Sequence, residues 1–283
     1  MELGSDADAF KTAKTIADVD LRQSAGFQWR HLDFNGAKGR ITADPAVRVA
    51  IQKGINRDLI AKALLGQITS KPSVLNNHMF IDGQDGFQAN NGDITYNPDE
   101  AKKELDAAGW TMSGQFRKKD GKQLDLHDVL PSGTPNASQE AQIIQQNLKE
   151  IGVNLIIDTV PSDDFFEKHV QVGDFDVTQF TWEDTVFPGS AQSIYSLTPG
   201  NIQQNYGQIG SDEINNLLNE MVTTTDPTKR NQIANQADEA IWKIGFSLPL
   251  YQRPYTYATK KALANFGAPG FGDTDMTKVG WLK

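Results

Sequence analysis

The stretch Asn136–Val160, NASQEAQIIQQNLKEIGVNLIIDTV, contains a helix pattern followed directly by a strand pattern. Ile144, Leu148 and Ile151 recur at helical spacing, and Gly152 stands where such a helix would end. The next residues, VNLIIDTV, are rich in β-branched side chains and have the length of one strand. The stretch therefore predicts a helix that leads into a strand of a sheet and packs against that sheet.

Strand and helix patterns also alternate on both sides of this stretch. KQLDLHDVL (122–130) has a strand pattern, SDDFFEKHVQVG (162–173) that of a short helix, and FDVTQFTW (175–182) that of the next strand. The order strand, helix, strand, helix, strand predicts an α/β fold, with a mostly parallel mixed sheet flanked by helices.

Helix starts are marked by capping residues at four further places. Asp44–Pro45, Asn97–Pro98 and Asp226–Pro227 each combine an N-cap side chain with a proline, which fits the first helical position. Ser211 precedes another amphipathic run. These signals predict helices on both sides of the central strand–helix pattern.

Composition excludes several kinds of protein. The chain has 283 residues, enough to bury a core as one large domain or two modest ones. Its formal net charge of −9 argues against binding to nucleic acid or to an anionic membrane surface, both of which require a basic patch. The absence of cysteine excludes disulfides, thiolate catalysis and zinc–thiolate sites.

No motif for catalysis, metal binding or cofactor binding stands out. The four histidines, His31, His78, His127 and His169, are scattered without the spacing of metal ligands. Neither a G-x-S-x-G motif nor a P-loop occurs. We therefore expect no enzymatic activity, no metal and no cofactor.

The segment TWEDTVFPGS (181–190) is the candidate site, because it follows a strand at the end where open α/β sheets place their ligands. It combines Trp182 with the acids Glu183 and Asp184, and Phe187 begins a rigid Phe-Pro-Gly turn. The residues alone leave two interpretations open: a ligand site, or a strand-end loop with a core tryptophan and solvated acids. A hydrolase that uses the two acids is less favoured, because two-carboxylate catalysis needs groups about 5–10 Å apart across a cleft.

Several segments match one family in its order. They are WRHLDFN (29–35), DPAVRVAIQKGINRDLI (44–60), YNPDEAKKELDAAGW (96–110), QNLKEIGVNLII (146–157), FDVTQFTWEDTVFP (175–188) and DPTKRNQIANQADEAIWKIGFSLPLY (226–251). Together they resemble the extracytoplasmic solute-binding proteins of ABC importers, of the oligopeptide/dipeptide/nickel-binding type. The resemblance covers nearly the whole chain from about residue 25 and implies a periplasmic-binding-protein-like lobe.

The resemblance also implies a domain organisation. Family members are longer, with an export signal, often a lipoprotein one, and an N-terminal lobe, whereas MELGSDADAFK (1–11) has no signal-peptide pattern. We expect a truncated, C-terminal portion of such a protein. Residues 1–40 would belong to or hinge toward the missing first lobe, 41–255 would form the second α/β ligand-binding lobe, and 256–283 would return toward the first lobe. Strand edges in the two end segments would lack partners.

For function, the resemblance implies capture of an extended oligopeptide or dipeptide between two lobes and delivery to the permease subunits of an ABC transporter. The location would be extracytoplasmic (periplasmic or cell-surface), with membrane attachment only through a lipid anchor outside this chain. The same scaffold also binds nickel complexes or sugars in other members, or serves as a surface adhesion or sensor protein. These remain alternatives.

The implied ligand contacts centre on one acid. In the family, an acid after a tryptophan and shortly before a proline anchors the peptide α-ammonium, and Asp184 takes this place with Glu183 as its rival. Thr181, Trp182 and Glu183 would offer backbone groups. The remaining candidates are Gln179, at a position that carries a carboxylate-binding arginine in some members, the loop residue Phe187, and Asn205.

Overall fold

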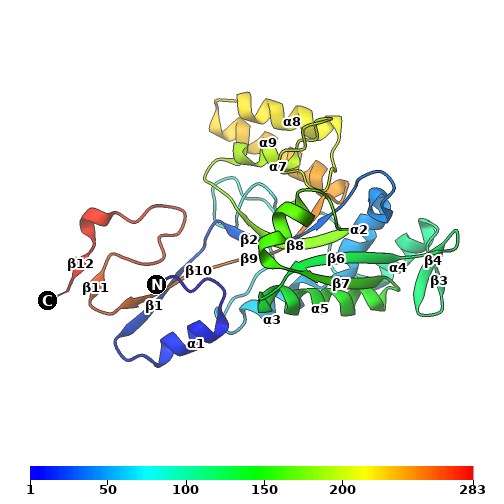
Figure 1. Cartoon of the computed structure of the whole chain (residues 1–283). Helices are drawn as coiled ribbons and strands as arrows, with labels where there is room; N and C mark the ends of the chain where they lie inside the picture. Colours follow the sequence, from blue (N-terminus) through cyan, green and yellow to red (C-terminus); the bar gives the residue numbers. More distant parts are fainter. Residues whose placement is uncertain (283) are drawn as a thin grey trace.

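The computed structural model describes residues 1–282, and a five-stranded sheet lies at its centre (Figure 1). The strands lie in the order β7 (Asn154–Val160), β6 (Asp125–Pro131), β8 (Val177–Glu183), β2 (Gln28–Phe34) and β9 (Ser247–Gln252). β6 is parallel to β7 and β8, whereas β2 is antiparallel to β8 and β9. β2 therefore runs against the other four strands, and the predicted mostly parallel mixed sheet is confirmed.

Helix α5 (Pro135–Glu150) connects β6 to the neighbouring parallel strand β7, as the opening stretch predicts. Its residues Ala141, Ile144 and Leu148 are buried, which places the apolar stripe of the helix toward the core. Gly152 follows with a φ of +81°, a left-handed conformation that glycine adopts without steric cost.

The predicted capping residues begin four of the other helices. The side chains of Asp44, Asn97, Ser211 and Asp226 each accept a backbone N–H of the first turn. The helices outside the central crossover are α1 (Ala7–Thr15), α2 (Pro45–Gly54), α3 (Arg57–Leu65), α4 (Pro98–Ala107), α6 (Ser162–Asp164), α7 (Gln192–Tyr195), α8 (Asp212–Thr223) and α9 (Pro227–Lys243). The short helix predicted at 162–173 continues from α6 as a π-helix, Phe165–Val170.

Two arginines of the family-like segments are buried and serve the scaffold. Arg48 donates to backbone carbonyl groups of Thr42, Ala43, Ile244 and Gly245. Arg57 donates in the same way to carbonyl groups that include those of Leu75 and Pro249. Each guanidinium satisfies carbonyl groups of segments far apart in the sequence, which explains these residues without a ligand.

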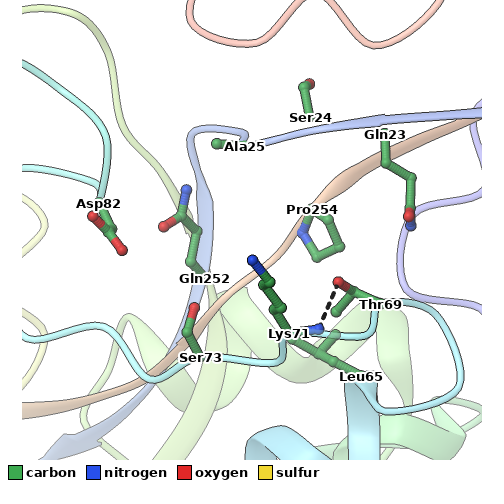
Figure 2. A pocket seen from close by; sticks show the side chains of 10 residues that line it. All are labelled: Gln23, Ser24, Ala25, Leu65, Thr69, Lys71, Ser73, Asp82, Gln252 and Pro254. Carbon is green, nitrogen blue, oxygen red and sulfur yellow. Dashed lines mark hydrogen bonds between the residues drawn. The ribbon is translucent and has the colours of Figure 1, made fainter.

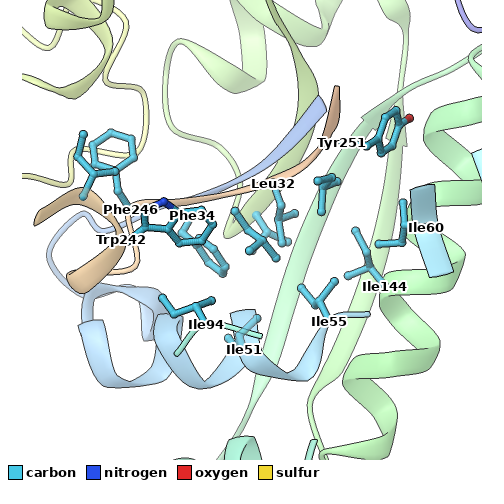
Figure 3. Packing of buried hydrophobic residues seen from close by; sticks show 14 of the residues in the cluster. Leu32, Phe34, Ile51, Ile55, Ile60, Ile94, Ile144, Trp242, Phe246 and Tyr251 are labelled. Carbon is cyan, nitrogen blue, oxygen red and sulfur yellow. The ribbon is translucent and has the colours of Figure 1, made fainter. Parts of the chain in front are cut away.

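The main core fills the space between the sheet and the helices beneath it. Figure 3 shows Leu32 and Phe34 of β2 beside Ile51 of α2, with Ile144 of α5 on the same side of the sheet. All four side chains are at most 1% exposed. Burial of this apolar surface is the main contribution to stability.

Beyond the sheet, β1 (Val19–Ser24) pairs with β10 (Tyr255–Lys260), and β11 (Leu263–Ala264) pairs with β12 (Gly280–Trp281). Figure 1 shows these strands and α1 projecting away from the central sheet, and we call them the ribbon. A small sheet of β3 (Thr111–Ser113), β4 (Phe116–Lys119) and β5 (Lys122–Gln123) completes the fold.

The ribbon and the central sheet are connected at two places in the chain. The chain enters the central sheet at β2, so residues 28–34 lie in that sheet, although they fall within the segment 1–40 that was expected to reach toward a first lobe. The chain leaves the sheet after β9 and re-enters the ribbon at Tyr255, close to the boundary expected at residue 255. The end strand predicted in VGWLK is β12, and Lys283 lies outside the described residues.

A buried ion pair links the sheet to α5. Arg30 on β2 donates through Nε and Nη2 to Oε2 of Glu140, at 3.0 and 2.8 Å. The Glu140 side chain is fully buried, and this burial raises its pKa, while the attraction of Arg30 opposes the rise. A charge in such a place depends on its partner, because neither group has access to enough water.

Removal of one partner should therefore be costly. We expect Glu140→Ala to lower the free energy of unfolding by about 3–5 kcal/mol, because Arg30 is left buried without its counter-charge. Urea unfolding at pH 7 measures the loss. The control is Glu220→Ala, which removes an exposed pair with Lys229 and should cost less than about 1 kcal/mol. Equal losses in the two variants would contradict this account.

Candidate functional site

Strand β8 has one open edge at its C-terminal end. It pairs with β2 from Val177 to Glu183, but with β6 only at Val177 and Thr178. The Asp184 N–H donates to the Phe27 carbonyl at 3.0 Å, on the β2 side. Because backbone groups of successive strand residues point to opposite edges, those of Thr181 and Glu183 point away from β2.

The open edge is accessible. Within residues 1–282, no strand pairs with Thr181 or Glu183 on that side. Thr181 is half-buried and Glu183 is exposed. The site therefore offers unpaired backbone donors and acceptors, the groups with which a binding protein adds an extended peptide to its sheet.

An aromatic patch lies on one face of the same strand end. It consists of Phe166, Phe180, Trp182 and Tyr206. Trp182 stacks with His31 and with Tyr206, with ring centroids 5.6 and 6.3 Å away and interplanar angles of 9° and 14°. Phe180 meets Trp182 edge-on at 5.0 Å, and Phe166 meets Phe180 at 5.3 Å. Trp182, predicted as a site residue, is thus held rigidly and half-buried.

Asp184 has an unusual environment for an acid. The residue as a whole is half-buried, but its Oδ2 is buried and has no hydrogen-bond partner among the described residues. Burial raises the pKa of Asp184 to about 7, and the neighbouring Trp29 indole N–H opposes this rise. The charge of Asp184 also helps to raise the pKa of the buried Tyr195. A buried carboxyl group without a counter-charge is a place where a cationic ligand group would be strongly favoured.

Glu183 faces a different environment. It is exposed and accepts hydrogen bonds from the Tyr255 hydroxyl at 3.2 Å and from Gln28 Nε2 at 3.4 Å. It also lines a pocket of about 460 Å³ between the sheet and the ribbon, together with Phe27 and Tyr257. The side chains of the two adjacent acids therefore lie in different surroundings. Of the two, Asp184 is the one with a buried oxygen that lacks a hydrogen-bond partner.

Two predicted site residues prove to be structural. Gln179 is fully buried and donates to Asp128 Oδ2 at 2.7 Å, so its side chain cannot reach a ligand. Asn205 is 1% exposed, donates to the carbonyl groups of Ser196 and Ile209, and accepts the Ile209 N–H. It holds its own loop, so we remove both residues from the candidate site.

Phe187 is 64% exposed on the loop after β8. Its N–H donates to Thr185 Oγ1 at 3.1 Å, which holds the turn, but its ring forms no aromatic pair within the described part of the chain.

The sequence did not reveal that Trp29, Tyr206 and Phe166 lie at the candidate site. These residues lie on three separate segments, and no spacing pattern connects them to Trp182.

A further pocket, of about 270 Å³, lies where the chain passes between ribbon and sheet (Figure 2). It does not include any of the seven predicted ligand residues. Its lining residues are Gln23, Ser24, Ala25, Leu65, Thr69, Lys71, Ser73, Asp82, Gln252 and Pro254.

In the described residues, no helix is both long and apolar enough to cross a membrane, and no cluster of three or more acid or histidine side chains could hold a metal.

Comparison with known proteins confirms the family. The model for bacterial extracellular solute-binding proteins, family 5 (middle), matches residues 3–205, and the chain belongs to this family. The oligopeptide-binding protein OppA of Mycobacterium tuberculosis is 44% identical over 276 residues, which cover 98% of this chain and 46% of OppA. The chain thus spans about half the length of these curated relatives.

Solved structures show the same fold. The periplasmic EDTA-binding protein EppA aligns with a TM-score of 0.86 at 22% identity, over 98% of this chain and 53% of that one. The oligopeptide-binding protein AppA of Bacillus subtilis, in complex with a nonapeptide, aligns with a TM-score of 0.82 at 20% identity, over 98% and 55% of the two chains. The predicted periplasmic-binding-protein-like lobe is therefore confirmed.

The raised pKa of Asp184 predicts a pH-dependent stability. An unfolded aspartate has a pKa of about 4, so between about pH 4 and pH 7 the folded protein holds a proton that the unfolded chain has released. The contribution of Asp184 to the free energy of unfolding therefore falls as the pH rises. We expect Asp184→Asn to gain stability relative to the wild type at pH 7.5 compared with pH 4.5.

Urea unfolding at both pH values measures this difference. Glu183→Gln is the matched control, because it removes the neighbouring but exposed acid. A difference between Asp184→Asn and wild type that does not change with pH would contradict the proposed environment of Asp184.

Proposed function

We propose that this chain forms the second lobe of a two-lobed peptide-binding protein, which captures extended peptides outside the cytoplasm and delivers them to the permease subunits of an ABC importer. The open edge of β8 is the observation that carries the proposal. Support also comes from the family, from OppA relatives that are named as oligopeptide-binding, and from the fold shared with a nonapeptide complex.

Affinity would come first from the backbone. A peptide laid along β8 pairs with the free N–H and C=O groups of Thr181 and Glu183, which continues the sheet by one strand. Backbone pairing does not read side chains, so one site accepts many sequences. This property suits an importer of mixed peptides and requires no catalytic step.

Asp184 would anchor the peptide α-ammonium. Its unpaired Oδ2 and its raised pKa support this role, because a carboxyl group in such a place would gain from a cationic partner. A hydrogen bond between an ammonium and a carboxylate is roughly twice as strong as a neutral one. We choose Asp184 over Glu183 because Glu183 is exposed and already accepts from Tyr255 and Gln28.

The ribbon would lead into the first lobe. In this arrangement residues 1–27 and 255–283 belong to or contact the first lobe, and residues 28–254 form the second. Two segments, residues 25–27 and 253–254, join ribbon and sheet, and a small change of backbone angles there would rotate one lobe against the other. Closure on the ligand would give the importer a state to recognise. A lipid anchor, as part of the longer protein, would keep it at the membrane.

Substitution at Thr181 tests the backbone contact. In the two-lobed protein, Thr181→Pro removes the N–H that points to the open edge but none that points to β2. We expect peptide binding to weaken by about 5- to 30-fold, as the loss of one or two hydrogen bonds implies. Isothermal titration calorimetry with a mixed peptide set measures this effect.

The matched control is Thr181→Ala, which keeps the backbone groups and should bind within about twofold of the wild type. Circular dichroism verifies that both variants are folded. Equal affinities of the proline and alanine variants, or a wild type that binds no peptide, would refute the proposed function.

The chain by itself should bind peptides weakly or not at all. In a two-lobed cleft, half of the ligand surface contacts the other lobe, and binding energy is lost when those contacts are missing. Calorimetry with the 283-residue chain and the same peptide set should give no saturation below about 1 mM. Micromolar binding by this chain would show that the cleft does not need a first lobe.

A further inference from the structure

The side chains at the open edge of β8 fall on two faces. Trp182 lies directly opposite Trp29 of β2, and Phe180 lies directly opposite His31, so these four rings share one face of the sheet. In a pleated sheet, a strand added at the other edge of β8 continues the same alternation. One residue of such a strand lies directly opposite Trp182, with the two Cβ atoms about 4.5–5.5 Å apart.

The surroundings of that position are aromatic. Trp182 stacks with His31 of β2 and also with Tyr206. Phe166, on the π-helix, is 40% exposed, and it reaches the same patch through Phe180. Trp182 and Tyr206 are half-buried, so a side chain placed opposite Trp182 would meet aromatic side chains that are still partly exposed.

The negative charge near this position also disfavours acidic ligand side chains. Asp33, which lies on the same face of β2, is 5% exposed and sits 3.4 Å from His31 Nε2. Burial and the charge of Asp33 together raise the pKa of Tyr206, so the electrostatic field of this carboxylate extends to the aromatic patch. An acidic ligand side chain there would face a like charge in a partly desolvated place.

We propose that Trp182, Tyr206 and Phe166 form a specificity pocket that selects an aromatic or large apolar side chain at one position of the bound peptide, the residue opposite Trp182. The inference rests on the proposed function, since it requires a peptide strand at the open edge of β8. It adds a preference to a site whose backbone contacts are blind to sequence. Aromatic pairs of this kind contribute about 2- to 10-fold each in affinity.

The test uses the two-lobed protein and a set of alanine hexapeptides in which one position at a time carries Phe, Ser or Glu. Calorimetry should show one position at which Phe binds at least about 10-fold more tightly than Ser, with Glu weaker than Ser. In Trp182→Ala and Tyr206→Ala this preference should fall below about threefold, while the all-alanine peptide still binds. If Trp182→Ala does not fold, Tyr206→Ala and Phe166→Ser measure the same loss.

Val172→Ala is the control, because Val172 is 65% exposed just after the π-helix and belongs to no part of the patch. It should keep the full preference. A wild type that binds all-alanine peptides without preferring Phe anywhere would overturn the specificity pocket and leave the proposed function intact. The same conclusion follows if the preference persists in both ring variants. A wild type that binds none of the peptides would overturn both proposals.

Discussion

The buried pair of Arg30 and Glu140 is the interaction on which the rest of the structure depends. It fixes β2 to α5, and β2 is the strand that reverses direction within the sheet. Because β2 occupies one edge of β8 throughout, the free backbone groups of β8 must lie at its other edge. The same strand leads back to the ribbon, so it connects the candidate site to the segments that would reach a first lobe.

Position in the fold, more than burial, distinguishes the structural acids of this chain from the candidate binding acid. Glu140 and Asp128 are both fully buried, but each has a side-chain partner, Arg30 or Gln179. The Asp184 Oδ2 is also buried and has none within residues 1–282. Desolvation raises the pKa of all three groups, and Oδ1 of Asp128 and Oε1 of Glu140 are also buried without a hydrogen-bond partner. Asp184 differs in its position, because it follows the open end of β8, where a ligand ammonium would supply the missing partner.

The family resemblance came mostly from residues that maintain the scaffold. Arg48 and Arg57 bind backbone carbonyl groups, and Asn97 caps α4. Each of these roles requires one type of side chain at one fixed position, so the sequence patterns are recognisable. The candidate site was predictable only where it is continuous in sequence, in the segment 181–184. Gln179 and Asn205 were misassigned because a polar side chain near a strand end gives no sign of which way it points.

The sequence by itself determined the α/β fold, the helix starts, the family and the strand end that carries Trp182 and Asp184. Hydrophobic period, capping residues and glycine positions act within a few residues of the chain, so they can be read from it. Only the tertiary structure decided that β8 has an open edge, that Asp184 lacks a partner, and that Phe166 and Tyr206 join Trp182. Each of these depends on segments distant in sequence that meet through packing.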